Sequence, residues 1–143
     1  MTAELVDLAA RYAAGADRRD PDLFVSAFLA EGRLRRYDPA DATEPSTDRQ
    51  GLDALAQVPG LLDRYSHTFH HLGQSRYDMV GDDTATGEIY CLAHHLTRTD
   101  PPVLQVMHIR YLDRYRRVDG QWGIEDRRVL VDLTEHRSIT VDG

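Results

Sequence analysis

Apolar residues at the start of the chain recur at a helical spacing. They follow an i, i+3, i+4, i+7, i+8, i+11 pattern, which predicts one apolar stripe of an amphipathic helix over residues 3–16. Asp17 comes directly after this stripe and closes the helical segment. The stripe consists of Leu5, Leu8, Ala9, Tyr12, Ala13 and Ala16.

The sequence Asp20-Pro21-Asp22 predicts the start of a second helix. An aspartate side chain caps helices well, and proline is favoured at the first helical position. We expect this helix to stop near Gly32 and to turn four apolar side chains inward. These are Leu23, Phe24, Ala27 and Phe28.

A polar segment separates these helices from the rest of the chain. Residues 33–37 suit a short strand, and residues 38–50 are rich in Pro, Asp, Thr and Ser, which predicts a loop. Such a loop can cover the entrance of a pocket, although a surface connection is its more common role. A third helix is expected from Gly51 toward Tyr65, broken or kinked at Pro59-Gly60.

From residue 69 onward the apolar period changes from that of a helix to that of a strand. Strands are predicted over residues 69–80, 84–97, 103–118 and 121–133. Asp119-Gly120 predicts a tight hairpin, because both central positions of that turn favour positive φ. Helices followed by antiparallel strands are typical of an α+β fold, in which a curved sheet wraps over the helices and encloses a cone-shaped pocket.

The composition is that of one globular domain. The chain has 143 residues, 41% hydrophobic and 29% charged, so we expect a single domain over residues 1–143 with one core. The formal net charge is −7 and the pI is near 5.4. These values argue against nucleic acid as a partner, since a nucleic-acid surface needs a basic face.

Three further features concern the compartment. Cys91 is the single cysteine, so no intrachain disulfide can form. No apolar run approaches the roughly 20 residues that cross a bilayer. The first residues lack the basic and apolar segments of a signal peptide. We therefore expect a cytoplasmic protein with no membrane partner.

Two pairs of adjacent histidines lie in the predicted sheet, where neighbouring side chains point to opposite faces. The odd positions before His95 are small or apolar, so His95 should point inward and His94 outward. For the first pair, the alternation of apolar and polar positions does not decide whether His70 or His71 points inward. One histidine of each pair, together with Asp17, could form a buried Asp/His/His cluster.

Three segments carry a resemblance to a known family. The opening Tyr12-Ala-Ala-Gly-Ala-Asp17-Arg-Arg-Asp20, then Phe28, resembles the start of the SnoaL-like branch of the nuclear transport factor 2-like superfamily. The segment from Arg110 to Ile124, with Asp119-Gly120-Gln-Trp122, resembles the last hairpin of that branch. Within the branch, Thr68-Phe-His70-His-Leu-Gly73-Gln-Ser-Arg76-Tyr77 and the interval to His95 resemble the scytalone dehydratase family.

This resemblance implies a cone-shaped α+β barrel and a role for each matching residue. Asp17 would hold the orientation and tautomer of His70, the general base, and His95 would donate to or orient the leaving oxygen. Of two family tyrosines that polarise the substrate carbonyl through a water, one aligns with Tyr37 after a one-residue insertion, and the other falls on Ala16. A family asparagine falls on Tyr111. The substrate-binding candidates are Tyr37, Tyr111, Cys91 and His108.

The chemistry that these residues suit is proton abstraction next to a carbonyl group. It needs a positioned base whose pKa lies near 7, and a hydrogen-bond donor for the developing enolate in a dry pocket. His70 with Asp17 would supply the first, and His95 with Tyr37 or Tyr111 the second. We therefore expect a cofactor-independent lyase of the dehydratase type, without a metal, acting on a small cyclic or polyketide-like carbonyl compound.

Other interpretations stay open. The same base would serve an isomerase or a cyclase, and the pocket could belong to a non-catalytic small-molecule-binding or accessory module, since fold does not fix function. Two histidines and a carboxylate also ligate non-haem iron, but the chain lacks the compact His-x-Asp/Glu spacing of many such sites. Asp17 could instead pair with Arg18 or Arg19, and Cys91 could be a small buried hydrophobe. The resemblance also implies a homo-oligomer, a dimer or a trimer.

Overall fold

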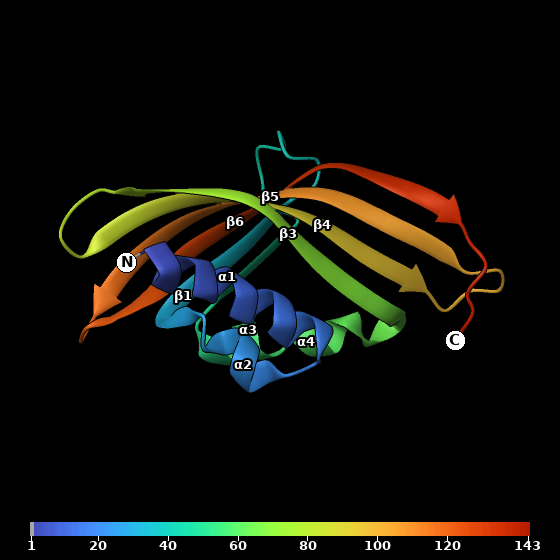
Figure 1. The fold of residues 1–143 in the computed structure, drawn as a ribbon, viewed down its shortest axis with the longest axis horizontal. Coiled ribbons are helices and arrows are strands. Elements are labelled where there is room, and N and C mark those ends of the chain that lie inside the picture. The colour runs from blue at the N-terminus through green and yellow to red at the C-terminus, as the bar shows by residue number, and fades with distance from the viewer. Residues whose placement is uncertain (1) are drawn as a thin grey trace.

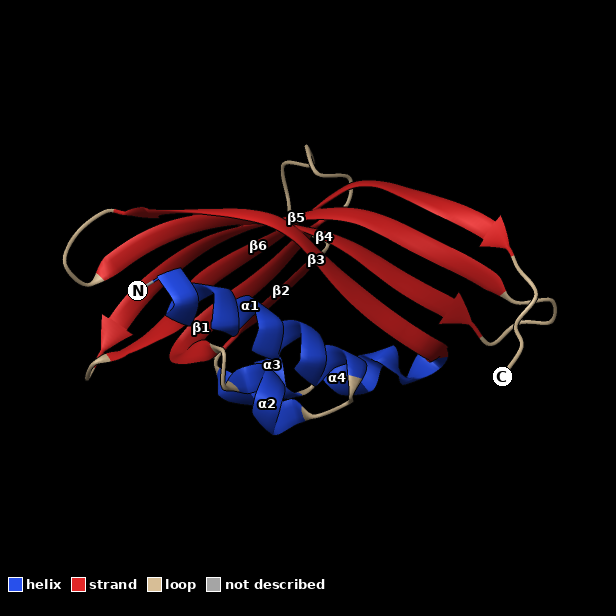
Figure 2. Ribbon diagram, in the orientation of Figure 1, coloured by secondary structure: helices blue, strands red, loops and turns tan. Residues whose placement is uncertain are grey.

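Long strands form one curved sheet, and the helices cover one of its faces (Figure 1, Figure 2). The computed structural model describes residues 2–143. The strands are β1 (Phe28–Tyr37), β2 (Thr47–Gln50), β3 (Tyr65–Met79), β4 (Thr84–Thr97), β5 (Val103–Val118) and β6 (Gln121–Ser138). Their order is β2-β1-β6-β5-β4-β3, with β1 and β6 parallel and the other neighbours antiparallel. The expected α+β cone is confirmed, although the sheet stays open, with β2 and β3 at its edges.

The sheet arches over the N-terminal helix, α1 (Thr2–Asp17) (Figure 1). The apolar stripe predicted for this helix is its buried face, as expected. The other helices are short: α2 (Pro21–Val25), α3 (Leu52–Ala56), α4 (Val58–Leu61) and a 3₁₀ turn (Leu62–Arg64). Among residues 2–143, none of the helices is long and apolar enough to cross a membrane.

The second helix is shorter than the sequence predicts. Its start is confirmed, because the Leu23 amide donates to the Asp20 side chain at 3.1 Å and Pro21 follows the cap. The prediction that it reaches Gly32 is wrong, since α2 ends at Val25 and Phe28 begins β1. The Ile124 amide of β6 donates to the Ala27 carbonyl, so pairing with a strand about a hundred residues away ends the helix.

The third predicted helix is also divided. It consists of α3, α4 and the 3₁₀ turn, and the break falls at Gln57 rather than at Pro59-Gly60. Pro59 lies in the first turn of α4, where its missing N–H leaves no hydrogen bond unmade. The predicted loop over residues 38–50 contains β2, which pairs with β1.

The four long strands follow the prediction closely. β4 and β5 have the predicted bounds, whereas β3 begins four residues earlier at Tyr65 and β6 continues to Ser138. Asp119 and Gly120 have φ values of 52° and 77°, which confirms the predicted hairpin turn.

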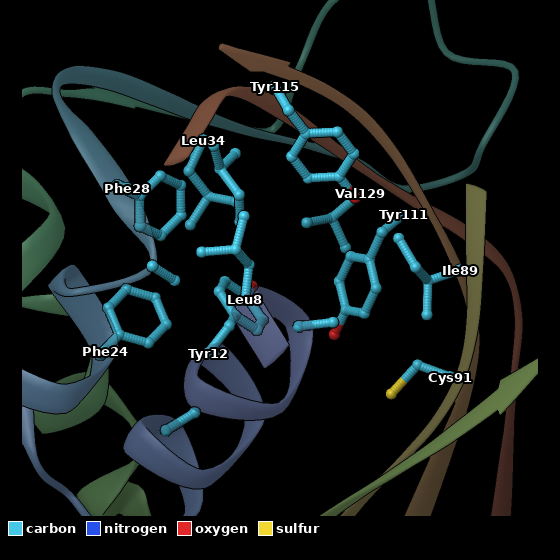
Figure 3. Close-up of a cluster of buried hydrophobic side chains, with 14 of the residues drawn as sticks. Leu8, Tyr12, Phe24, Phe28, Leu34, Ile89, Cys91, Tyr111, Tyr115 and Val129 are labelled. Atoms are coloured by element: carbon cyan, nitrogen blue, oxygen red, sulfur yellow. The ribbon is translucent and has the colours of Figure 1, made fainter. Parts of the chain in front are cut away.

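The core between α1 and the sheet is rich in aromatic rings (Figure 3). It also contains an ion pair with no solvent exposure: the Arg127 guanidinium donates to both Asp113 oxygens at 2.8 and 2.7 Å. The ring centroids of Tyr12 and Tyr111 lie 4.4 and 4.2 Å from the guanidinium carbon of Arg127. This arrangement ties α1 to β5 and β6.

Candidate active site

Asp17 and His70 meet beneath the arch of the sheet. His70 Nδ1 lies 2.6 Å from Asp17 Oδ1, and the His70 backbone amide donates to Oδ2 at 2.8 Å. An ionised carboxylate only accepts hydrogen bonds, so Nδ1 carries the proton and Nε2 of the neutral ring has a free lone pair. The His70 side chain is 9% exposed and the Asp17 side chain 21% exposed. This is the arrangement of an oriented, largely dry general base.

Arg19 and Thr68 hold the carboxylate in place. Arg19 has a left-handed φ of 54° just past the end of α1. Its guanidinium donates to the Ala16 carbonyl at 2.8 Å and to the Thr68 hydroxyl at 2.9 Å. That hydroxyl in turn donates to Asp17 Oδ1 at 3.1 Å. Asp17 therefore sits at a helix end fixed by hydrogen bonds to β3.

The surroundings keep Asp17 ionised. Burial by itself would raise the pKa of the carboxyl, but the hydrogen bonds and the charge of His70, with the Thr68 hydroxyl, outweigh it and lower the pKa. Asp17 is thus an acceptor and not a proton donor at neutral pH. The proton that catalysis would move belongs to the imidazole.

His95 faces the same interior as His70. The register pairs Thr68 with His95 and His70 with Ala93, so the two histidines are diagonal neighbours on one face. Their ring centroids are 5.9 Å apart, and the Tyr65 ring lies 4.4 Å from that of His95. The predicted inward orientation of His95 agrees with its 6% exposure.

Both ring nitrogens of His95 are buried, and within residues 2–143 neither has a hydrogen-bond partner. Burial lowers the pKa of His95 to about 4, and the charges of His70, Arg36 and Arg64 act in the same direction. The imidazole is therefore neutral at pH 7 and has one N–H group available. A buried polar group without a partner is rare in native proteins, and a bound substrate oxygen would satisfy it.

A cavity of about 400 Å³ opens beside these histidines. Its apolar part is lined by α1, α2 and the inner face of the sheet, and its polar part by residues near the ends of the strands. This volume falls within the range for small-molecule sites. The apolar part includes Tyr12, Ala16, Phe24, Leu34, Ile109, Tyr111 and Val129.

The structure brings only some of the predicted residues to this cavity. Tyr111 lines it together with His70 and His95. Tyr37 and His108 lie in separate hollows of the opposite sheet face, so their assignment as substrate contacts is wrong for this cavity. Cys91 is 3% exposed, and Figure 3 shows its sulfur directed into the aromatic core.

The structure explains why Tyr37, His108 and Cys91 do not serve as expected. Tyr37 follows Arg36, and the residues of β1 alternate, so the inward position is that of Arg36. His108 pairs directly with Leu92 on the outer face of β4. Burial raises the pKa of the Cys91 thiol to about 11, which makes it a poor nucleophile.

Several residues of the site, among them Thr68 beside Asp17, were not predicted from the sequence. Thr68 lies two positions before His70, so strand parity could have placed it on the same face. Tyr12 was predicted only as a core residue, yet it lines the cavity. The arginines of the cavity carry no sequence motif. Residues 2–143 contain no group of three or more His, Cys, Asp or Glu side chains that could hold a metal ion.

The fold and the site place this chain among small α+β domains in which a curved sheet and the N-terminal helices enclose a pocket. The family model described as a SnoaL-like domain matches residues 2–128, so the chain belongs to the SnoaL-like domain family. No curated protein matches the chain.

Solved structures share this fold over nearly the whole chain. A candidate scytalone dehydratase from Novosphingobium aromaticivorans has a TM-score of 0.79 at 20% identity, covering 99% of this chain and 89% of its own. The hexachlorocyclohexane dehydrochlorinase LinA-type3 from Novosphingobium barchaimii has a TM-score of 0.82 at 15% identity, covering 96% and 90%. A candidate aromatic ring hydroxylase from N. aromaticivorans has a TM-score of 0.77 at 18% identity, covering 94% and 91%. At these identities the likeness establishes the fold alone.

Proposed function

We propose that this protein is a cofactor-independent lyase of the dehydratase type, acting on a small cyclic or polyketide-like carbonyl compound. The observation that carries the proposal is the 2.6 Å contact between Asp17 and His70, beside a neutral His95 in a cavity of substrate size. Two of the similar structures bear the names of a dehydratase and a dehydrochlorinase, and both names describe eliminations.

In the proposed reaction His70 Nε2 removes a proton from the carbon next to the substrate carbonyl. Asp17 accepts the hydrogen bond from Nδ1 and stabilises the imidazolium that forms. The C–O bond to a β-hydroxyl group then breaks as the C=C bond forms. The proton on His70 passes to the departing hydroxide, so the products are an unsaturated carbonyl compound and water, and His70 is neutral again.

His95 has a separate part in this scheme. Its N–H donates to the carbonyl oxygen, where negative charge develops as the proton leaves. A neutral imidazole can act as such an electrophile, since it donates a hydrogen bond without bringing in a full charge. The absence of any partner for the His95 nitrogens within residues 2–143 supports this role.

The first test uses α-proton exchange, which needs the base but no particular leaving group. We expect the protein to accelerate deuterium uptake by β-tetralone in D2O, followed by NMR. The variants His70→Ala and Asp17→Asn should each reduce the enzymatic rate about 10²–10⁴-fold, the usual contribution of a positioned acid or base. Loss of water from β-hydroxyketones, detected by mass spectrometry, would separate a lyase from an isomerase.

The chain provides matched controls for this experiment. His71 and His94 are the sequence neighbours of the two site histidines and lie outside the cavity lining. The variants His71→Ala and His94→Gln should keep the wild-type exchange rate. Full activity in both His70→Ala and Asp17→Asn would disprove the proposed base.

A further inference from the structure

The polar end of the cavity is cationic in a protein whose formal net charge is −7. Three arginines line this cavity, Arg36, Arg49 and Arg64, against a single acidic lining residue, Asp38. They come from β1, β2 and the 3₁₀ turn, three segments that are separate in the sequence. Positive side chains from separate elements thus converge on one end of a site in an acidic chain.

The contacts of these arginines leave most of their charge available. Arg36 pairs with Asp38 at 2.9 Å, and both side chains are more than a third exposed. Arg49 donates to two neutral groups, the Ala54 carbonyl and the Gln57 side chain, each at 3.2 Å. The guanidinium carbon of Arg64 lies 5.2 Å from the Tyr65 ring centroid. Among residues 2–143, neither Arg49 nor Arg64 forms an ion pair.

Two of these arginines lie near enough to His95 that their charges contribute to the lowering of its pKa. Arg36 contacts the sulfur of Met107 at 3.4 Å, and Arg64 lies against the ring that stacks on His95. In the sheet, His95 pairs with Gln105, and Gln105 pairs with His136, so a row of polar side chains crosses β4, β5 and β6. Gln105 and His136 both line the cavity.

We propose that the substrate carries a carboxylate group, which Arg36, Arg49 and Arg64 bind while its apolar body lies against Tyr12 and Tyr111. Guanidinium groups match the planar geometry of a carboxylate and bind it through two parallel hydrogen bonds. The apolar end of the cavity requires an organic acid rather than a small inorganic anion. This inference rests on the proposed function only in taking the same cavity as the substrate site.

The test compares two ligands that differ in charge and little in shape, naphthoate and naphthamide. Neither has a β-hydroxyl group, so binding is measured without turnover. By calorimetry at low ionic strength we expect naphthoate to bind about tenfold more tightly, the effect of one charge-assisted hydrogen bond. Added salt should reduce this preference, because the arginines are partly exposed.

Variants then assign the preference to these residues. Arg36→Gln, Arg49→Gln and Arg64→Gln should each reduce the ratio of the two affinities, and the variant that combines all three substitutions should remove it. Arg76→Gln is the matched control, since Arg76 lines a hollow on the opposite face of the sheet. It should keep the wild-type ratio. Equal affinity for both ligands in the wild type, or a ratio unchanged in all the cavity variants, would overturn the proposal.

The two proposals fail separately. His70→Ala should lose proton exchange and keep the preference for naphthoate, because that preference comes from the three arginines, which this variant retains. An active His70-dependent enzyme without that preference would leave the proposed function intact and refute the carboxylate site. A preference for naphthoate without any proton exchange would support the carboxylate site and refute the proposed function.

Discussion

His95 is a base that its surroundings keep from binding a proton. Burial lowers its pKa from an ordinary value of about 6.5 to about 4. Between these two values the unfolded chain binds a proton at this residue and the folded chain does not. The free energy of unfolding therefore decreases as the pH falls through this range, and the loss is complete near pH 4.

This linkage gives a measurable pH dependence. On going from pH 7 to pH 5, the wild type should lose roughly 2 kcal/mol more of its unfolding free energy than His95→Gln does, because that variant has no group to titrate. Urea unfolding at the two pH values measures the difference. His94→Gln should behave like the wild type. Equal losses in wild type and His95→Gln would show that His95 binds its proton normally.

The sequence could place His95 and could not place His70, for a reason visible in their neighbours. Small and apolar residues on one face of β4 mark the interior. On β3 a register shift between Leu72 and Ser75 reverses the alternation, so Tyr77 and Met79 do not indicate which face the histidines before the shift occupy. The pairing with Asp17 decides the orientation of His70, and that contact spans 53 residues of sequence.

Helix α1 ends at Asp17, the carboxylate that orients His70 in the proposed base, and the position of the helix depends on how it packs against α2. A Cβ atom on Gly15 would lie 2.5 Å from the Phe24 nitrogen and 2.6 Å from its Cα. Backbone atoms cannot rotate away as a side chain can, so a methyl group there must push the two helices apart. Gly15 is two residues before Asp17, and such a shift would also move the carboxylate.

We expect Gly15→Ala to lower the free energy of unfolding by about 1–3 kcal/mol and to reduce proton exchange. Gly60→Ala is the matched control, since a Cβ atom there meets no atom within 4 Å and alanine favours helices over glycine. Denaturant unfolding and the β-tetralone exchange rate test both effects. A Gly15→Ala protein with wild-type stability and activity would contradict the close packing of α1 on α2.

Elements whose pattern is local were predicted from the sequence, and those that depend on a distant partner were not. β4 and β5 alternate regularly between two turns, and their predicted bounds are those observed. The stretch after Val25 has helix-like apolar spacing, yet it becomes β1 because β6 pairs with it in parallel. A parallel partner brings no hairpin turn that the sequence could reveal.

Across the whole molecule, the Asp113–Arg127 pair joins the parts of the fold that enclose the cavity. Both side chains are completely buried, and Tyr115 also donates to Asp113 at 2.6 Å. Removing one partner of a buried pair leaves an uncompensated charge in a medium that solvates it poorly. The effect should reach the cavity, because Tyr12 and Tyr111 both stack on Arg127 and line it.

Asp113→Asn should therefore lower the free energy of unfolding by about 3–5 kcal/mol. Asp48→Asn provides the comparison, since Asp48 forms an exposed pair with Arg33 and its loss should leave stability close to that of the wild type. Thermal and urea unfolding of both variants give the comparison. If the two variants lost equal stability, burial would not determine how much these ion pairs contribute to the free energy of unfolding.

The unpartnered nitrogens of His95 have a consequence for the evolution of this chain. A leucine at that position would end the cost of holding an imidazole away from water, so heat resistance and turnover would favour different residues there. A library selected only for survival at high temperature should accumulate aliphatic residues at position 95 and lose the proposed activity. A histidine at this position is what selection for turnover, rather than for durability, would keep.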